Sequence, residues 1–180
     1  MWLVLLIAIL LSGSSAQPSL AQLHETAQLM PRSASALSNY GLGLKAAGQP
    51  ETALLLFEQA LEIEPTYFRA YNNMGTAYSA IGGIDNIRLA IASHRAAISL
   101  VPTFASAYNN LGTALSALNE PAAAVDALDS ALAIDHAFAA AYTNLGSAYV
   151  ALGQLEAGVR ACVLGAALKP ASLEAHNALG

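Results

Sequence analysis

The segment Asn109-Asn110-Leu111-Gly112-Thr113-Ala114 decides the fold, because related segments recur along the chain. The related segments are Asn39-Tyr40-Gly41-Leu42-Gly43, Asn72-Asn73-Met74-Gly75-Thr76-Ala77 and Thr143-Asn144-Leu145-Gly146-Ser147-Ala148. The glycine that these segments share recurs after 34, 37 and again 34 residues. Self-similarity at such a period indicates stacked supersecondary units, each of which buries its apolar face against the next.

Each unit closes with an apolar stretch that predicts a second helix, and most of these stretches end at a proline. The closing segments are Ile63-Glu64-Pro65, Leu100-Val101-Pro102, Ile134-Asp135-His136 and Leu168-Lys169-Pro170. Proline cannot continue a helix and disfavours helix at the preceding residue, so it sets the end of the second helix. Pro50 and Pro121 follow predicted turns, and we expect them to begin second helices, where a missing N–H costs nothing.

Further residues recur in phase with the glycines: an aromatic residue early in the first helix, a glycine at the turn and two alanines in the second helix. They are Tyr71, Tyr108 and Tyr142, then Gly48, Gly82 and Gly153, then Ala53, Ala60, Ala90, Ala97, Ala124 and Ala131. In these residues the chain resembles the tetratricopeptide repeat (TPR) family. The resemblance implies an all-α fold, a right-handed superhelical solenoid of TPR helix-turn-helix hairpins, and a function in protein binding.

The phase of the repeat predicts the organisation of the chain. The expected parts are a signal peptide (1–16), an N-terminal linker with a lone helix (17–33), TPR 1 (34–67), TPR 2 (68–104), TPR 3 (105–138), TPR 4 (139–172) and the truncated start of TPR 5 (173–180). TPR 2 carries three extra residues around Gly82-Gly83-Ile84-Asp85-Asn86, which predict a longer turn with Asp85 as the helix N-cap. In TPR 4, Gly158 and Gly165 replace the alanines, and we expect a looser second helix there.

The first residues have the layout of a secretory signal peptide. Trp2 to Leu11 form an apolar run that is shorter than the ~20 residues of a membrane-spanning helix. Ser14 and Ala16 supply the small residues before a cleavage site, so we expect an exported, periplasmic or secreted chain that begins at Gln17. No Lys or Arg precedes the run, and a membrane anchor formed by an uncleaved leader is the alternative.

Composition and motifs predict no enzyme, no cofactor, no metal site and no nucleic-acid partner. The seven Lys and Arg form no cluster, and the formal net charge is −5. The four histidines share no metal-ligand spacing, and no catalytic triad, paired-carboxylate motif or phosphate-binding loop occurs. His94 stands at an aromatic packing position and the single cysteine, Cys162, in an apolar stretch, so we expect both side chains in the core.

The first helices are expected to line the concave face on which a repeat stack binds its partner, a protein or a peptide. Residues three and four apart share a helix face, and this spacing gathers amide and hydroxyl side chains. The candidate peptide-binding residues are Asn39, Asn72, Asn73, Thr76, Asn109, Asn110, Thr113, Asn144 and Ser147. We call Asn39, Asn73, Asn110 and Asn144, which recur once per repeat, the asparagine ladder.

An amide both donates and accepts hydrogen bonds, so the asparagine ladder can pair with the backbone of an extended peptide without reading its side chains. The pattern is similar to the asparagine ladder in the repeat domains of O-linked N-acetylglucosamine transferases. A structural role, in which these asparagines hold neighbouring helices together, is equally compatible with their positions. The sequence is also compatible with self-association through an open apolar face at the C-terminal end, or with a fragment of a larger TPR-containing enzyme.

Overall fold

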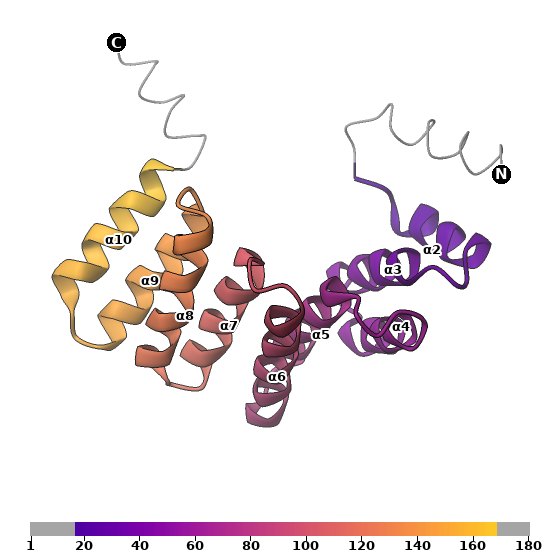
Figure 1. Ribbon diagram of the computed structural model, residues 1–180, viewed down its shortest axis with the longest axis horizontal. Helices are drawn as coiled ribbons and strands as arrows, with labels where there is room; N and C mark the ends of the chain where they lie inside the picture. Colours follow the sequence, from indigo (N-terminus) through magenta and orange to yellow (C-terminus); the bar gives the residue numbers. More distant parts are fainter. Residues whose placement is uncertain (1–16, 169–180) are drawn as a thin grey trace, which may run out of the picture. The chain divides into compact units, whose positions relative to one another are not determined.

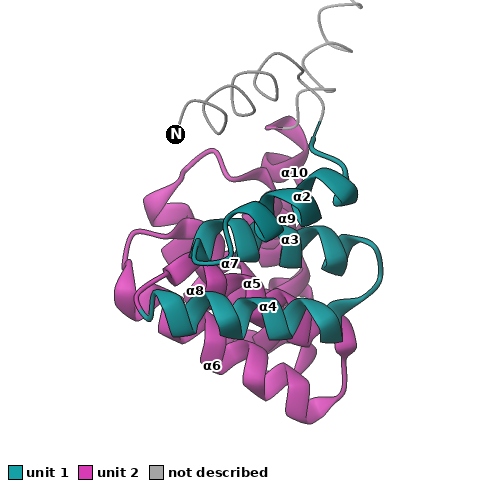
Figure 2. Cartoon of the chain, turned by 90° about the vertical axis from the view of Figure 1, so that its right-hand side faces the viewer, with its two compact units in different colours: residues 1–65 teal, residues 66–180 magenta. Residues whose placement is uncertain are grey.

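The computed structural model describes residues 17–168, and every regular element in that range is an α-helix (Figure 1). The chain divides into two compact units, unit 1 (Met1–Pro65) and unit 2 (Thr66–Gly180), coloured separately in Figure 2. The expected signal peptide (1–16) and the expected start of a fifth repeat (173–180) lie outside the described residues. Within the described range, no helix has the length and apolar character that a membrane span requires.

Unit 1 contains the lone helix α2 (Leu20–Leu29) and the hairpin of α3 (Ala34–Ala46) and α4 (Pro50–Ile63). Serine side chains cap the N-termini of α2 and α3. Ser19 forms a capping box with Gln22, and the Ser33 hydroxyl accepts a hydrogen bond from the Ala36 amide. Pro50 is the first residue of α4, as the sequence predicts.

Unit 2 contains three helical hairpins, which follow one another in Figure 1. The helices are α5 (Phe68–Ile81) with α6 (Ile84–Leu100), α7 (Ala105–Ala117) with α8 (Pro121–Ile134), and α9 (Ala139–Ala151) with α10 (Leu155–Ala167). The second helix of one hairpin also packs against the first helix of the next, α6 against α7 and α8 against α9. The first helices α5, α7 and α9 are neighbours in turn, which gives unit 2 the all-α hairpin stack expected of a TPR solenoid.

In every hairpin the recurring glycine of the first helix lies against one side chain of the second helix. The pairs are Gly41 with Phe57, Gly75 with His94, Gly112 with Leu128, and Gly146 with Cys162. A Cβ atom added at Gly112, for example, would lie only 2.6 Å from Leu128 Cγ. Glycine therefore stands at these positions because any side chain would push the two helices apart.

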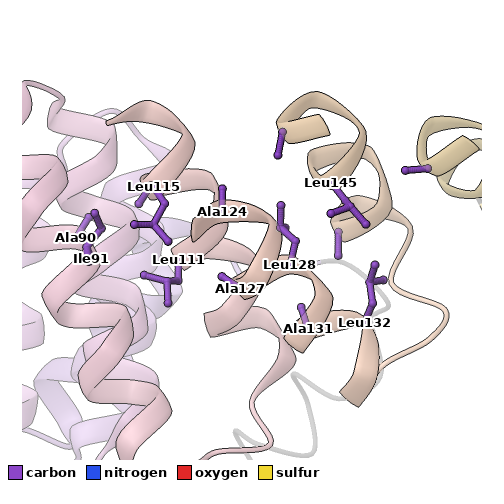
Figure 3. Close-up of a cluster of buried hydrophobic side chains, with 14 residues drawn as sticks. Ala90, Ile91, Leu111, Leu115, Ala124, Ala127, Leu128, Ala131, Leu132 and Leu145 are labelled. Atoms are coloured by element: carbon purple, nitrogen blue, oxygen red, sulfur yellow. The ribbon is translucent and has the colours of Figure 1, made fainter. Parts of the chain in front are cut away.

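Alanines and aliphatic side chains fill the rest of the core, as the sequence predicts. The second-helix alanines at the two recurring positions are fully buried: Ala53, Ala60, Ala90, Ala97, Ala124 and Ala131. Figure 3 shows a cluster of buried side chains that runs from Ile91 of α6 through Leu115 of α7 and Leu128 of α8 to Leu145 of α9. This continuous packing between hairpins is what a repeat array uses in place of a single globular core.

The three extra residues of the second hairpin lengthen a helix and not the turn, so the expected longer turn is wrong. α6 has 17 residues, whereas α4 and α8 have 14 each. Only Gly82 and Gly83 separate α5 from α6, and both have positive φ angles that glycine adopts without strain. The N-cap is Gly83. Asp85 lies in the first turn of α6, where it forms an exposed ion pair with Arg88 at 3.4 Å.

The two glycines of α10 allow a close approach to α9. A Cβ atom at Gly158 would lie 2.8 Å from Val150 Cγ2, and one at Gly165 would lie 2.9 Å from the Ala139 carbonyl oxygen. The expectation that α10 would be looser was based on helix propensity alone. The structure adds a packing reason for glycine at both positions, since alanine would separate the two helices.

Cys162 differs from its expected place in the core. Its sulfur lies against Gly146, yet the residue as a whole is exposed. The equivalent residue of the preceding hairpin, Leu128, is fully buried because α9 covers α8. The burial of this position therefore depends on the element that follows the hairpin, which the apolar stretch around Cys162 does not reveal.

We predict that Gly112→Ala lowers the free energy of unfolding by about 1–3 kcal/mol, although alanine is the better helix former, because the added methyl group overlaps Leu128. Chemical denaturation monitored by circular dichroism measures the change. The double variant Gly112→Ala/Leu128→Ala is the control. If the close contact is the cause, the combined effect is smaller than the sum of the two single effects.

Candidate peptide-binding face

The first helices carry the nine candidate residues at three levels of exposure. Asn39 of α3 lies in unit 1, and the others lie on α5, α7 and α9 of unit 2. The exposed residues are Asn39, Thr113 and Ser147; the half-buried ones are Asn73, Thr76, Asn110 and Asn144; the buried ones are Asn72 and Asn109. The candidates of unit 2 therefore form a surface that continues inward between the helices.

Four asparagines of unit 2 are linked by hydrogen bonds across three repeats. Asn144 Nδ2 donates to Asn109 Oδ1 at 2.9 Å, and Asn110 Nδ2 donates to Asn72 Oδ1 at 3.1 Å. Asn109 Nδ2 donates to Asn110 Oδ1 at 3.3 Å, which joins the two links into one chain. We call these four residues the amide network. In both links between repeats, the asparagine at the second of the two adjacent positions (Asn110 or Asn144) donates to the asparagine at the first position of the repeat before it.

His94 of α6 ends the amide network in the interior of the second hairpin. Its side chain is 1% exposed, and its Nδ1 lies 3.1 Å from Asn72 Oδ1. Because Asn72 Oδ1 is an acceptor, a neutral imidazole with its proton on Nδ1 donates this bond. Burial lowers the pKa of His94 from 6.5 to about 4, so the ring is neutral at physiological pH. The expectation that His94 lies in the core is confirmed.

Asn144 of α9 is the other end of the amide network. Asn144 also donates to Thr113 Oγ1 at 3.2 Å, which uses its second N–H, while its Oδ1 accepts no hydrogen bond from the described residues. In the last described repeat, Thr143 stands where Asn72 and Asn109 stand in the repeats before. Its hydroxyl donates to the Ala139 carbonyl of its own helix, so the amide network stops there.

The sequence did not show how these asparagines pair. The asparagine ladder consists of Asn39, Asn73, Asn110 and Asn144, whereas the hydrogen bonds of unit 2 use Asn72 and Asn109 as the acceptors between repeats. The Asn73 carbonyl accepts a hydrogen bond from the Thr76 hydroxyl at 2.8 Å. The available signal was the adjacent pair Asn-Asn, since one residue of such a pair can point inward while the other reaches the next helix.

Few charges lie near this surface in unit 2. Arg69 at the start of α5 stacks over the Phe68 ring, 5.5 Å from its centroid. The carboxylates lie mostly on second helices, where burial and the neighbouring Asp126 raise the pKa of Asp129. Among residues 17–168, no three His, Cys, Asp or Glu side chains are placed so that they could hold a metal ion. The surface is suited to polar, uncharged contacts.

We predict that the stability of the chain falls as the pH decreases from about 6.5 to about 4, because the unfolded state binds a proton at His94 that the folded state excludes. The contribution is full above pH 6.5, and its loss approaches about 3 kcal/mol, since each pKa unit corresponds to about 1.4 kcal/mol. Denaturant midpoints across this pH range measure it.

The matched control for this pH effect is His94→Leu. This change gives the second hairpin the leucine that the third hairpin has at the equivalent position, Leu128. Asp129 and the other carboxylates remain in both proteins, so the difference between the two pH profiles isolates His94. Identical pH profiles for the two proteins would contradict the assignment.

We predict that Asn144→Ala lowers the free energy of unfolding by about 1–3 kcal/mol, because it leaves the buried Asn109 Oδ1 without its donor. Ser147→Ala on the same helix is the control, since the exposed Ser147 hydroxyl bonds only to the Thr143 carbonyl of its own helix. Equal effects of the two substitutions would show that the amide network does not link the repeats. Thermal and chemical denaturation both report the difference.

Comparison with known proteins agrees with this architecture. A TPR repeat model matches residues 41–82, and tetratricopeptide repeat models match residues 104–134 and 139–171. No curated protein sequence matches significantly. Among solved structures, MamA is 22% identical with a TM-score of 0.71, and the match covers 86% of this chain and 89% of that chain.

Two further structures extend the likeness. MamA residues 41-end from Desulfovibrio magneticus RS-1 is 22% identical, with a TM-score of 0.69 and coverage of 83% and 82%. TTC0263, a thermophilic TPR protein of Thermus thermophilus, is 19% identical, with a TM-score of 0.77 and coverage of 86% and 84%. At these identities the structures establish the fold alone. Together with the repeat matches, they show that the chain belongs to the tetratricopeptide repeat family.

Proposed function

We propose that the chain is a non-catalytic scaffold that binds extended, weakly charged peptide segments of a partner protein on its first-helix face. TPR repeats serve in general as protein-interaction modules, and the family match supports that coarser role. The observation that carries the finer proposal is the row of amides and hydroxyls on α5, α7 and α9, which is held in place by the amide network.

Among residues 17–168, the amide network does not use all of its hydrogen-bonding capacity. Asn144 Oδ1 can accept a hydrogen bond, and Asn110 Nδ2 donates only one of its two N–H groups, to Asn72. One acceptor and one donor on neighbouring helices match the alternating N–H and C=O groups of an extended backbone. The structural and peptide-binding roles of the asparagines therefore coexist, because the inner amides fix the orientation of the outer ones.

A test of peptide binding must leave the amide network intact. We predict that Ser116→Arg/Ser147→Arg, which adds bulk at exposed positions of α7 and α9, weakens the binding of extended uncharged peptides by about tenfold or more. The wild-type affinity should change little with added salt, since few charges lie on the face. Fluorescence anisotropy with a peptide library measures both.

The matched control is Ser99→Arg on the second helix α6, where the exposed serine likewise bonds only to a carbonyl of its own helix. This variant should bind as the wild type does. Equal losses in both variants, or wild-type binding that disappears in salt, would contradict peptide capture on the first-helix face. Circular dichroism verifies that all variants remain folded.

Export is the second part of the proposal and is supported by the leader sequence. We predict that expression with residues 1–180 in a secretion-competent cell yields a mature chain that begins at Gln17, because Ser14 and Ala16 fit a cleavage site. Intact-mass measurement of the recovered protein identifies the first residue. Ala16→Arg should block cleavage. A full-length, membrane-associated wild type would instead support the anchored alternative.

A further inference from the structure

A cleft of about 260 Å³ lies on unit 2 between α6, the end of α7 and the turn that leads to α8. Its floor is apolar, because the lining residues Ile91 and Leu115 are buried and Leu118 is half-buried. The second and third hairpins form the cleft, and the fourth packs against the third, so the cleft does not arise from an end of the described range. The exposed charged residues on its rim are Arg88 and Arg95 of α6 and Glu120, which precedes α8.

The two rim positions of α6 are basic in the second hairpin alone. At the spacing of the repeat, the counterparts of Arg88 are Glu51, Ala122 and Glu156, and those of Arg95 are Glu58, Asp129 and Val163. The whole chain has only seven Lys and Arg against twelve Asp and Glu. Repetition of the TPR pattern therefore does not account for two arginines beside one cleft.

Both guanidinium groups keep hydrogen-bond donors for a ligand. The Arg95 guanidinium forms no hydrogen bond or ion pair with residues 17–168. Arg88 Nη1 lies 3.4 Å from Asp85 Oδ1, and an ion pair as exposed as this one contributes little. A guanidinium carries five N–H donors in a fork that matches a carboxylate. The cleft thus offers partners for two carboxylates beside an apolar floor.

We propose that this cleft binds an acidic segment of a partner protein, in which two carboxylates flank one aliphatic side chain. Arg88 and Arg95 are seven residues apart, so they lie on one face of α6 and about 10 Å apart along its axis. In an extended segment of the pattern Glu-x-Leu-x-Glu, all three side chains point to one face, and the glutamates are about 14 Å apart. The long arginine side chains can match that separation.

The size of the cleft suits the single leucine of such a segment. At about 260 Å³ the cleft is smaller than the ~300–1,000 Å³ of small-molecule sites, so it accommodates one side chain better than a whole small molecule. The leucine then contacts the apolar floor while the flanking carboxylates pair with the arginines above it.

Glu120 favours a peptide over other anions. It is the N-cap residue of α8, but its side chain forms no capping hydrogen bond. A carboxylate repels a ligand that carries only negative charge, such as an oligonucleotide, whereas it accepts hydrogen bonds from the backbone N–H groups of a peptide. None of the cleft residues belongs to the nine candidates of the first-helix face, so this site is separate from the one under the proposed function.

Fluorescence anisotropy of the purified protein with the labelled peptide Gly-Ser-Glu-Ser-Leu-Ser-Glu-Ser-Gly tests the proposal. Saturable binding is expected, and added salt should weaken it, because the charges meet in exposed positions. Exchange of both glutamates of the peptide for glutamine should lower the affinity by about tenfold or more. Exchange of its leucine for serine should also lower the affinity, since the apolar floor then has no partner.

Arg88→Glu/Arg95→Glu, which gives α6 the residues of α4 at both positions, should lower the affinity for this peptide by about tenfold or more. Both side chains are exposed, and circular dichroism verifies that the variant is folded. The matched control is Arg69→Glu/Arg160→Glu, which changes the net charge equally and should bind as the wild type does.

Three results would overturn the proposal: no saturable binding by the wild type, equal losses in the two double variants, or equal affinity for a short oligonucleotide of the same charge. Ser116→Arg/Ser147→Arg, which tests the first-helix face, should leave the binding of the acidic peptide unchanged. The two proposals can therefore fail separately.

Discussion

The close approach of a glycine on each first helix to one side chain on each second helix is the constraint on which the rest of the structure depends. Only a residue without a Cβ atom allows Phe57, His94 or Leu128 to lie directly against the first helix. That approach sets the distance between the first and second helices of a hairpin. The buried alanines of the second helix then let neighbouring hairpins pack at similarly short range.

The second-helix position that faces this glycine accepts side chains of different chemistry, once the distance between the two helices is set. Phenylalanine and leucine fill it with apolar volume, whereas His94 fills it and also donates a hydrogen bond to Asn72. A buried polar group is tolerated only when it has a partner, and the amide network supplies that partner. A direct hydrogen bond thereby connects the second hairpin to the third, and another connects the third to the fourth, in addition to the contacts between α6 and α7 and between α8 and α9.

Much of the fold could be predicted from the sequence because glycine, proline and alanine recur at the spacing of the repeat and mark its turns, helix ends and close helix contacts. The features that escaped prediction depend on contacts that this recurrence does not reveal. Adjacent asparagines differ by about 100° around a helix, so the sequence does not show whether Asn72 or Asn73 turns inward. The insertion near Gly82 could extend either the turn or α6, and the exposure of Cys162 depends on what lies over α10.

The amide network also gives the repeats of unit 2 a direction. Each link runs from the asparagine at the second of the two adjacent positions in one repeat to the asparagine at the first position in the repeat before it, so the repeats are not interchangeable. A duplicated copy of the third repeat could be inserted beside the original, because it carries both a donor and an acceptor. A copy of the fourth repeat, which has Thr143 in place of the acceptor, would interrupt the series at any internal position. The polar side chains of the repeats therefore limit the order in which the repeats can follow one another. Repeat duplication during evolution would be restricted to copies that carry both a donor and an acceptor.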